Sequence, residues 1–268
     1  MGQVVAEART AGGGTIVVQG ASKVFGLGRT VVQALESIDL SIEGGEFVSV
    51  VGPSGCGKTT LMLMVAGLVP VSGGSILVDN VEVRRPLTDI GIVFQDALLL
   101  DFRTALGNVA LQMQVRGSGR AQAKAQARVV LEQMGLGGAV NRYPHELSGG
   151  MRQRVSLGRA FIHNPSILLM DEPFASLDAI TRTQMHHDLE QLWITNRKTV
   201  LFITHNVEEA VRLSDRIVVM SPSPGRVVEQ LVVDSARPRP VAIEERPELS
   251  AVAQEIYRCF SELGVLRT

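Results

Sequence analysis

The feature that most constrains this fold is a glycine-rich turn at residues 52–59, with the sequence GPSGCGKT. It follows an apolar run, EFVSVV, and precedes a helical run, TTLMLMVAG. This G-x-x-x-x-G-K-T spacing between a strand and a helix is typical of a phosphate-binding loop, because glycines let backbone N–H groups surround a phosphate at the positive end of the helix. Lys58 would then bridge the outer phosphates, and the Thr59 hydroxyl would ligate magnesium.

The rest of the chain alternates between strand and helix patterns. A helical insertion is expected at about 96–160, a helix with one apolar face at 179–196, and a closing amphipathic helix at 247–263. Strands that alternate with helices predict an α/β fold with a mainly parallel sheet and helices on both sides. Short β-branched runs bounded by turn residues predict strands at 15–22, 37–42, 46–52, 75–83, 89–95, 166–171, 199–205 and 216–221.

Composition narrows the class of protein. With 45% hydrophobic and 20% charged residues, the chain has the composition of a globular protein, and residues 1–14, which end in three glycines, are expected to be a flexible tail. The 26 basic and 27 acidic side chains give a net charge of −1, so no basic excess favours nucleic acid as a partner. Cys56 and Cys259 lie far apart and predict no disulfide framework. No apolar run reaches about 18 residues, so we expect a cytosolic protein that touches a membrane only through a partner.

Two acidic residues, Asp171 and Glu172, end the apolar run at 167–171. The carboxyl end of a parallel strand emerges at the same sheet edge as the phosphate loop. Two adjacent acids there can divide two roles: Asp171 would hold the magnesium shell, and Glu172 would orient or deprotonate the attacking water.

A second anion site is predicted at Leu147-Ser148-Gly149-Gly150, which opens the helical run MRQRVSLGRAFI. A serine and free backbone N–H groups at a helix start attract phosphate. A chain with one phosphate loop needs no second phosphate-binding helix for its own nucleotide. A nucleotide bound by a partner subunit would explain why this second helix start is present.

These motifs, followed by Ser176-Leu177-Asp178 and a strand ending in Thr204-His205, occur in an order that closely resembles the ATP-binding-cassette (ABC) ATPases. The resemblance covers residues 15–230 and leaves 231–268 as a C-terminal extension whose role the sequence does not define. It implies a P-loop, RecA-like mixed sheet with an antiparallel β subdomain and a helical signature-motif subdomain. It also implies a head-to-tail homodimer that binds ATP and Mg²⁺.

The resemblance assigns roles by position. Gln95 matches the glutamine that reaches magnesium and the water, His205 the switch histidine at the γ-phosphate, and Phe25 the aromatic that stacks on adenine. The implied catalytic residues are Glu172, His205, Lys58 and Gln95, and the implied magnesium ligands are Thr59, Gln95 and Asp171. The ATP-binding residues of one subunit would be Phe25, Gly52, Pro53, Ser54, Gly55, Cys56, Gly57, Lys58, Thr59 and Thr60. Those that reach the partner's ATP would be Ser148, Gly149, Gly150, Gln153 and Asp178.

Several of these residues have simpler interpretations when taken singly. Phe25 could be a core residue, and Cys56 could be a redox sensor or an inert small side chain. His145, His163, His186 and His187 form no metal-ligand set in sequence. We expect the His186-His187 pair to lie on a solvated helix face.

Residues 170–182 and 221–228 look like the corresponding segments of importers for nitrate, taurine, alkanesulfonates and related anions. That subfamily implies two membrane permease subunits docking near Gln95–Arg103, a separate substrate-binding protein, and a peripheral place on the cytoplasmic face of the cell membrane. Met151 and Asp101-Phe102 depart from the usual pattern. The alternatives are an ATPase of an exporter or lipid-moving system, a non-transport ABC ATPase, and a nucleotide-gated scaffold, although the presence of Lys58 and Glu172 argues against the last.

Overall fold

The computed structural model describes residues 13–27 and 30–266. The predicted N-terminal tail lies outside this part of the chain except for its last two glycines. Gly13 packs closely against Gly45, and the Thr199 hydroxyl donates a hydrogen bond to the Gly14 carbonyl. Gly13 and Gly14 therefore pack against the folded domain.

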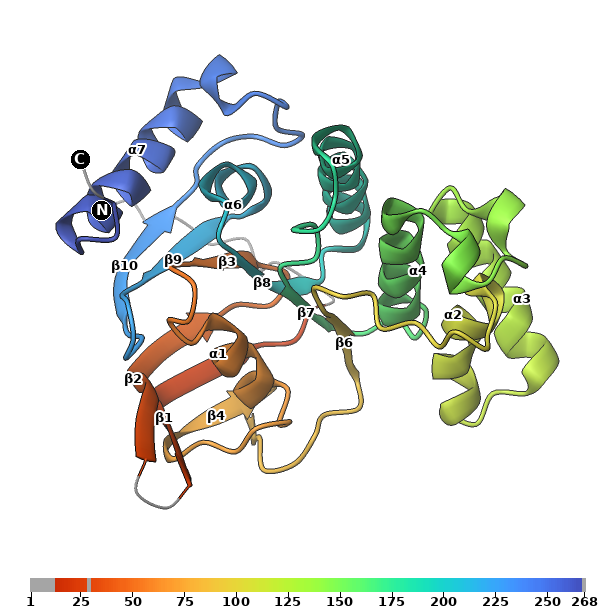
Figure 1. The fold of residues 1–268 in the computed structure, drawn as a ribbon, viewed down its shortest axis with the longest axis horizontal. Coiled ribbons are helices and arrows are strands. Elements are labelled where there is room, and N and C mark those ends of the chain that lie inside the picture. Colours follow the sequence, from red (N-terminus) through yellow and green to blue (C-terminus); the bar gives the residue numbers. More distant parts are fainter. Residues whose placement is uncertain (1–12, 28–29, 267–268) are drawn as a thin grey trace, which may run out of the picture.

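Two sheets form the framework (Figure 1). The smaller one is antiparallel, with the strand order β2-β1-β4-β5. The larger one has the order β10-β9-β3-β8-β7-β6, and all of its pairs are parallel except β10 with β9. Together they confirm the predicted α/β fold with a mixed sheet and an antiparallel subdomain. The strands are β1 (Ile16–Leu27), β2 (Thr30–Ile42), β3 (Phe47–Val51), β4 (Gly73–Val78), β5 (Val81–Glu82), β6 (Ile90–Val93), β7 (Ile167–Asp171), β8 (Thr199–Thr204), β9 (Arg216–Met220) and β10 (Val227–Val232).

Helices cover both faces of the larger sheet, as the continuous apolar strands require. Every residue of β3, β7 and β8 is buried, because these central strands are covered on both sides. Helix α1 lies between the two sheets, whereas α5, α6 and α7 lie on the opposite side (Figure 1). The helices are α1 (Lys58–Val65), α2 (Ala105–Val115), α3 (Arg120–Gln133), α4 (Gly149–Phe161), α5 (Ala179–Asn196), α6 (Val207–Leu213) and α7 (Pro247–Glu262), with short 3-10 turns at Gly137–Ala139, Pro144–Glu146 and Ile243–Glu245. None of the helices in the described ranges is both long and apolar enough to cross a membrane.

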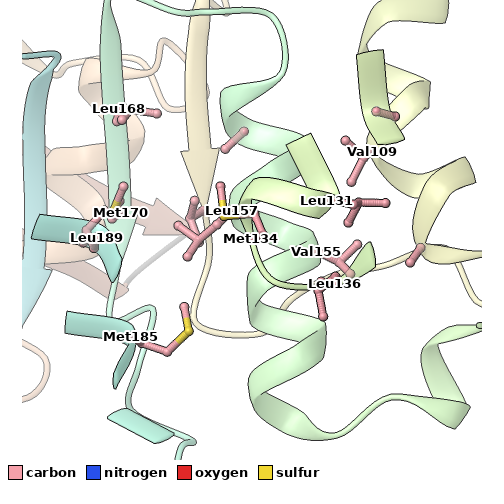
Figure 2. Close-up of a cluster of buried hydrophobic side chains, with 14 of the residues drawn as sticks. Val109, Leu131, Met134, Leu136, Val155, Leu157, Leu168, Met170, Met185 and Leu189 are labelled. Atoms are coloured by element: carbon pink, nitrogen blue, oxygen red, sulfur yellow. The ribbon is translucent and has the colours of Figure 1, made fainter. Parts of the chain in front are cut away.

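The expected helical insertion contains α2, α3 and nearly all of α4. Helices α2 and α3 extend away from the sheets, whereas α4 lies beside β6 (Figure 1). Their buried side chains do not form a separate core. Val109, Leu131 and Val155 belong to one cluster with Met170 of β7 and Met185 of α5 (Figure 2). Helix α4 therefore connects the helical subdomain to the sheet through continuous apolar packing.

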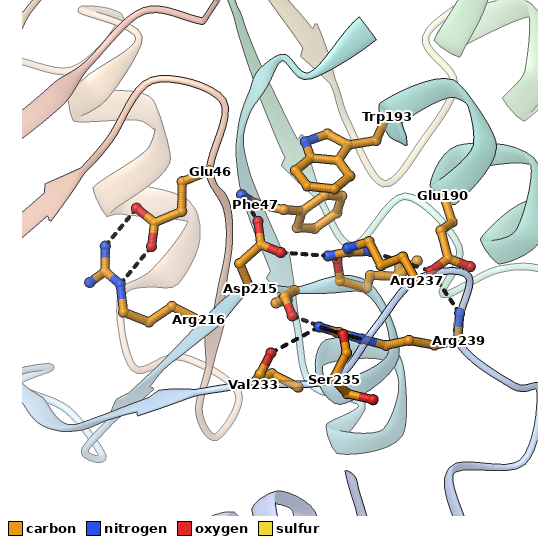
Figure 3. A network of polar contacts seen from close by, with 12 residues as sticks. Glu46, Phe47, Glu190, Trp193, Asp215, Arg216, Val233, Ser235, Arg237 and Arg239 are labelled. Carbon is orange, nitrogen blue, oxygen red and sulfur yellow. Dashed lines mark hydrogen bonds and ion pairs between the residues drawn. The ribbon is translucent and has the colours of Figure 1, made fainter. Parts of the chain in front are cut away.

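Two arginines, Arg237 and Arg239, attach the C-terminal extension to the rest of the domain (Figure 3). The Arg239 guanidinium is buried and donates to five backbone carbonyls, those of Val211, Arg212, Ser214, Val233 and Ser235. Burial, helped by the charge of Arg237, lowers the pKa of Arg239 to about 10.

Arg237 stacks over the Trp193 ring, with 4.3 Å between its guanidinium carbon and the ring centroid. It also contacts the carboxylates of Glu190, at 3.4 Å, and Asp215, at 3.1 Å. We call these four charged residues, Arg237, Arg239, Glu190 and Asp215, the C-terminal latch.

Several strand predictions were incomplete. The run at 75–83 forms two antiparallel strands, β4 and β5, because Asp79 and Asn80 make a turn with φ values of 49° and 62°. β2 begins at Thr30 rather than near residue 37, because it pairs with β1 along a long twisted hairpin with several register shifts. β10 was not predicted at all, because it follows a proline-rich turn and most of its side chains are exposed, which removes the apolar alternation that marks a strand.

Candidate functional site: a nucleotide-binding edge

Four strands of the larger sheet end at one edge and bring the predicted site residues there. Strand register pairs Val51 of β3 with Thr204 of β8, and Asp171 of β7 with Ile203 of β8. β6 is aligned with β7 through Val93 and Met170. The glycine-rich turn, His205, Glu172 and Gln95 each follow one of these strand ends, so residues from four distant segments meet at the carboxyl edge of a parallel sheet.

The glycine-rich turn has the geometry of a phosphate cradle. Gly55 and Gly57 have φ values of 78° and 100°, a region that only glycine enters without strain. A β carbon at Gly57 would also lie 2.5 Å from the Leu35 side chain of β2. The Lys58 ammonium is buried and donates to the carbonyls of Gly52, at 2.8 Å, and Pro53, at 3.0 Å, so its charge is held over the turn.

The residues of the turn differ in their exposure to solvent. Ser54, Gly55 and Thr59 are exposed, Pro53, Gly57 and Thr60 are half-buried, and Gly52, Cys56 and Lys58 are buried. Burial raises the pKa of the Cys56 thiol. A buried thiol with a raised pKa is unreactive, which favours the inert interpretation of Cys56 over a redox sensor.

Thr59 and Asp171 form the pair expected of a magnesium site. The Thr59 hydroxyl donates to the Asp171 carboxylate at 3.0 Å. Burial raises the pKa of Asp171, and the nearby charge of Glu172 adds to that effect, whereas the hydrogen bond from Thr59 opposes it. A hydroxyl oxygen beside a carboxylate fits Mg²⁺, which prefers hard oxygen ligands and completes its shell with phosphate oxygens and water.

Glu172 and His205 contact each other directly. His205 Nδ1 lies 2.8 Å from Glu172 Oε2, and both side chains reach solvent at the sheet edge. The Glu172 backbone has a φ of 43°, uncommon for a residue with a β carbon, and its N–H is held by the Ile203 carbonyl at 2.9 Å. This backbone conformation turns the carboxylate away from the strand direction and toward His205.

Phe25 lies on β1 of the antiparallel sheet and is half exposed, with the Lys23 ammonium 4.9 Å from its ring centroid. Two close approaches fix that sheet to the glycine-rich turn. One is the contact of Leu35 with Gly57. The other is made through Gly225, which lies between β9 and β10 and bridges to Leu35 of β2; a β carbon at Gly225 would lie 1.9 Å from the Cys56 carbonyl. The ring is therefore available to stack on a base, on an element held against the phosphate cradle. Nothing in the sequence around Gly225 indicates this anchoring role.

The second predicted anion site is on the surface. Ser148 is the N-cap of α4, accepting a hydrogen bond from the Met151 amide at 3.3 Å, and it is exposed together with Gly149. Asp178 caps α5 in the same way, and the hydrogen bonds from Thr181 lower the pKa of its carboxyl. Gly150 lets these two helix starts meet, since a β carbon there would lie 2.5 Å from the Thr181 side chain.

Gln153 and His186 differ from expectation. Gln153 is only 2% exposed, and its amide donates to the Phe94 carbonyl at 3.4 Å. It therefore supports the segment that leads to the exposed Gln95 rather than facing a partner. His186 is buried and paired with Glu209, so our prediction of a solvated face was wrong for His186, although His187 is exposed.

Fold and site together define a P-loop nucleoside triphosphatase with an added antiparallel sheet and a helical subdomain. The family profile described as ABC transporter matches residues 35–175. The chain is 44% identical to an uncharacterized ABC transporter ATP-binding protein, MJ0412, of Methanocaldococcus jannaschii over 222 residues, 83% of each chain. It is 47% identical to the taurine import ATP-binding protein TauB of Escherichia coli over 204 residues, 76% of this chain and 80% of TauB.

Among solved structures, the ATP-binding cassette MJ0796, in a dimeric post-hydrolysis state bound to ADP and phosphate, superimposes with a TM-score of 0.74. The two sequences are 31% identical, and the match covers 82% of this chain and all of MJ0796. The chain belongs to the ABC transporter family and is an ABC-type ATPase.

Proposed function

We propose that this ATPase energises an importer. Two copies would couple ATP binding and hydrolysis to the uptake of a small anion, such as nitrate, taurine or an alkanesulfonate. The anion would pass through two separate membrane subunits, to which a separate substrate-binding protein delivers it. The relative TauB is named a taurine import ATP-binding protein, which supports both import as the direction of transport and a small anion as the substrate class. The protein would then lie peripherally on the cytoplasmic face of the cell membrane.

The observation that carries the hydrolytic part is the 2.8 Å contact between Glu172 and His205 at the edge beyond the phosphate cradle. Glu172 would orient and deprotonate the water, while His205, hydrogen-bonded to Glu172, would hold the γ-phosphate. Lys58 would contribute positive charge at the outer phosphates. Gln95, which follows the end of β6, would orient the attacking water. Magnesium, held by Thr59, Asp171 and Gln95, would neutralise charge on the phosphates.

In the proposed homodimer, the helix start at Ser148-Gly149-Gly150, where Ser148 and Gly149 are exposed, and Asp178 of one subunit would face the ATP held by the other. This arrangement predicts that wild-type turnover per subunit rises with protein concentration. Ser148→Arg would place a bulky cation in that interface, so we expect low turnover that no longer depends on concentration. Phosphate release over a dilution series measures the turnover per subunit and its dependence on protein concentration, for the wild type and for the variant.

Binding of a fluorescent ATP analogue should be unchanged in Ser148→Arg, because its own phosphate cradle is intact. The matched control is Ser41→Arg, an exposed serine of β2 far from the carboxyl edge, which should behave as wild type. Wild-type turnover that is independent of concentration would contradict the dimer.

The proposed docking surface for the membrane subunits is the loop from Leu98 to Arg103, which follows Gln95. Phe102 is 75% exposed and Leu98 is 58% exposed. Asn108, fully buried, holds the loop through hydrogen bonds to Leu100 and Arg103, and Arg159 donates to the carbonyls of Ala97 and Leu98. An ordered loop that presents a large aromatic side chain to solvent supports a partner contact.

We expect Phe102→Asp to detach the protein from membranes while leaving basal ATP turnover within about twofold, since Phe102 is exposed and is not one of the residues proposed to bind or hydrolyse ATP. Sedimentation of membranes from cells that express the chain measures the attached fraction. Val115→Asp, at an equally exposed apolar position on α2, should stay attached. Equal detachment of both variants, or of neither, would argue against this surface.

A further inference from the structure

A buried polar cluster lies behind the switch histidine, formed by His186, Glu209, Thr204 and Asn206. His186 Nε2 lies 2.6 Å from Glu209 Oε1. The Thr204 hydroxyl donates to the other carboxylate oxygen of Glu209 and accepts from the Asn206 amide at 3.0 Å. The Asn206 side chain in turn accepts from the Glu209 amide at 3.0 Å. The cluster thus joins α5, α6 and the end of β8.

Burial makes these contacts obligatory. His186 is 7% exposed, Glu209 is 5% exposed and Thr204 is 2% exposed. A carboxylate that is removed from water must be paired or hydrogen-bonded at both oxygens, or its burial is strongly unfavourable. A carboxylate oxygen only accepts, so the His186 ring supplies the donor on one side and Thr204 supplies it on the other.

The cluster fixes the two residues that flank His205. Thr204 precedes it, Asn206 follows it, and both are held by Glu209. The His205 ring itself projects away from the cluster toward Glu172. The backbone that carries the switch histidine is therefore positioned from behind by Glu209, and Glu209 is positioned by His186.

His186 also connects this support to the region that faces the proposed partner. Helix α5 carries His186 and is capped by Asp178. The Phe174 ring, from the segment between Glu172 and Asp178, packs edge-on against the His186 ring with 5.3 Å between centroids. One buried imidazole thus contacts α6 on one side and the segment that follows Glu172 on the other.

We propose that His186 is a positioning residue for hydrolysis: through Glu209 and Thr204 it sets the His205 backbone and so the hydrogen bond between His205 and Glu172. This inference rests on the proposed roles of His205 and Glu172. A purely structural pair would contribute only to stability, whereas a positioning residue controls turnover without affecting nucleotide affinity.

The test compares His186→Leu with His186→Gln. The Gln amide can donate to Glu209 as the imidazole does, whereas Leu cannot. We expect His186→Leu to lower kcat by about tenfold or more, the loss that misplacement of a catalytic group causes. The affinity for a fluorescent ATP analogue should stay within about twofold, since His186 contacts none of the residues proposed to bind nucleotide. His186→Gln should keep at least about half of the wild-type kcat, as the hydrogen bond is preserved.

His187→Leu, at the exposed neighbouring position, is the control and should match wild type. If His186→Leu does not fold, Thr204→Val removes the hydroxyl from the far end of the cluster at nearly constant volume, and it should lower kcat in the same way. The inference is wrong if His186→Leu keeps turnover, if His186→Gln loses as much as Leu, or if kcat and nucleotide affinity fall together.

Parallel assays of Glu172→Gln and His205→Ala separate this inference from the proposed function. If both lose turnover while the His186 and Thr204 variants do not, the positioning role alone fails. If Glu172→Gln and His205→Ala keep wild-type turnover, the proposed catalytic roles fail, and the positioning role fails with them.

Discussion

Glu172→Gln should reduce ATP turnover by roughly 100-fold or more, the loss expected when a general base is removed. Gln has the same shape and its carbonyl oxygen can still accept from His205, so the geometry at the sheet edge is preserved while the capacity to take a proton is lost. ATP binding should be retained, because Glu172 lies outside the phosphate cradle. The variant should therefore accumulate as an ATP-bound dimer.

Phosphate release measures the first effect, and size-exclusion chromatography with light scattering in saturating Mg-ATP measures the second, as a shift from the 28.8 kDa monomer to twice that mass. Glu208→Gln is the matched control: it makes the same chemical change at an exposed acid of α6 that borders the phosphate-binding loop. If Glu172→Gln retains more than a tenth of wild-type turnover and stays monomeric, Glu172 is not the base.

Arg239→Met should destabilise the protein by about 3 kcal/mol, because five backbone carbonyls would lose their buried donor and methionine offers none in return. For a chain of this length that is a fall in melting temperature of roughly 8 °C. Differential scanning calorimetry measures it. The C-terminal extension should detach first, since the latch is its polar attachment to α5 and α6 in the described structure.

Arg258→Met is the appropriate comparison. Arg258 lies on the same extension and forms ion pairs with Glu255 and Glu262, but it is exposed, so its loss should leave the melting temperature unchanged. Equal effects from the two variants would show that the latch does not hold the extension.

Local pattern was sufficient to predict much of the site. The glycine-rich turn, the strand before it and the helix after it are contiguous, so their geometry follows from the conformational freedom of glycine and from apolar periodicity. Asp171, Glu172 and His205 each end an apolar run, and the ends of parallel strands meet at one edge whatever the details of packing. The structure places these residues together at that edge, as their positions in the sequence predict.

Tertiary packing decided what periodicity does not encode. His186 and His187 are adjacent and chemically identical, yet α6 covers the first and leaves the second in water. Gln153 was expected at a subunit interface but is buried beneath the segment that follows β6. The C-terminal latch joins residues 47 apart in sequence, Glu190 and Arg237, and no pattern in either segment indicates the other.

The nucleotide-binding edge thus follows from local sequence, because turn geometry and strand ends depend on neighbouring residues. Which polar side chains are buried, and what they bind, follows instead from the packing of distant segments. The burial of a side chain depends on which distant element packs over it, and a buried polar group must then find its partner on that element. The support behind His205 is such a case: the histidine is apparent in the sequence, whereas the residues that position it are apparent only in the fold.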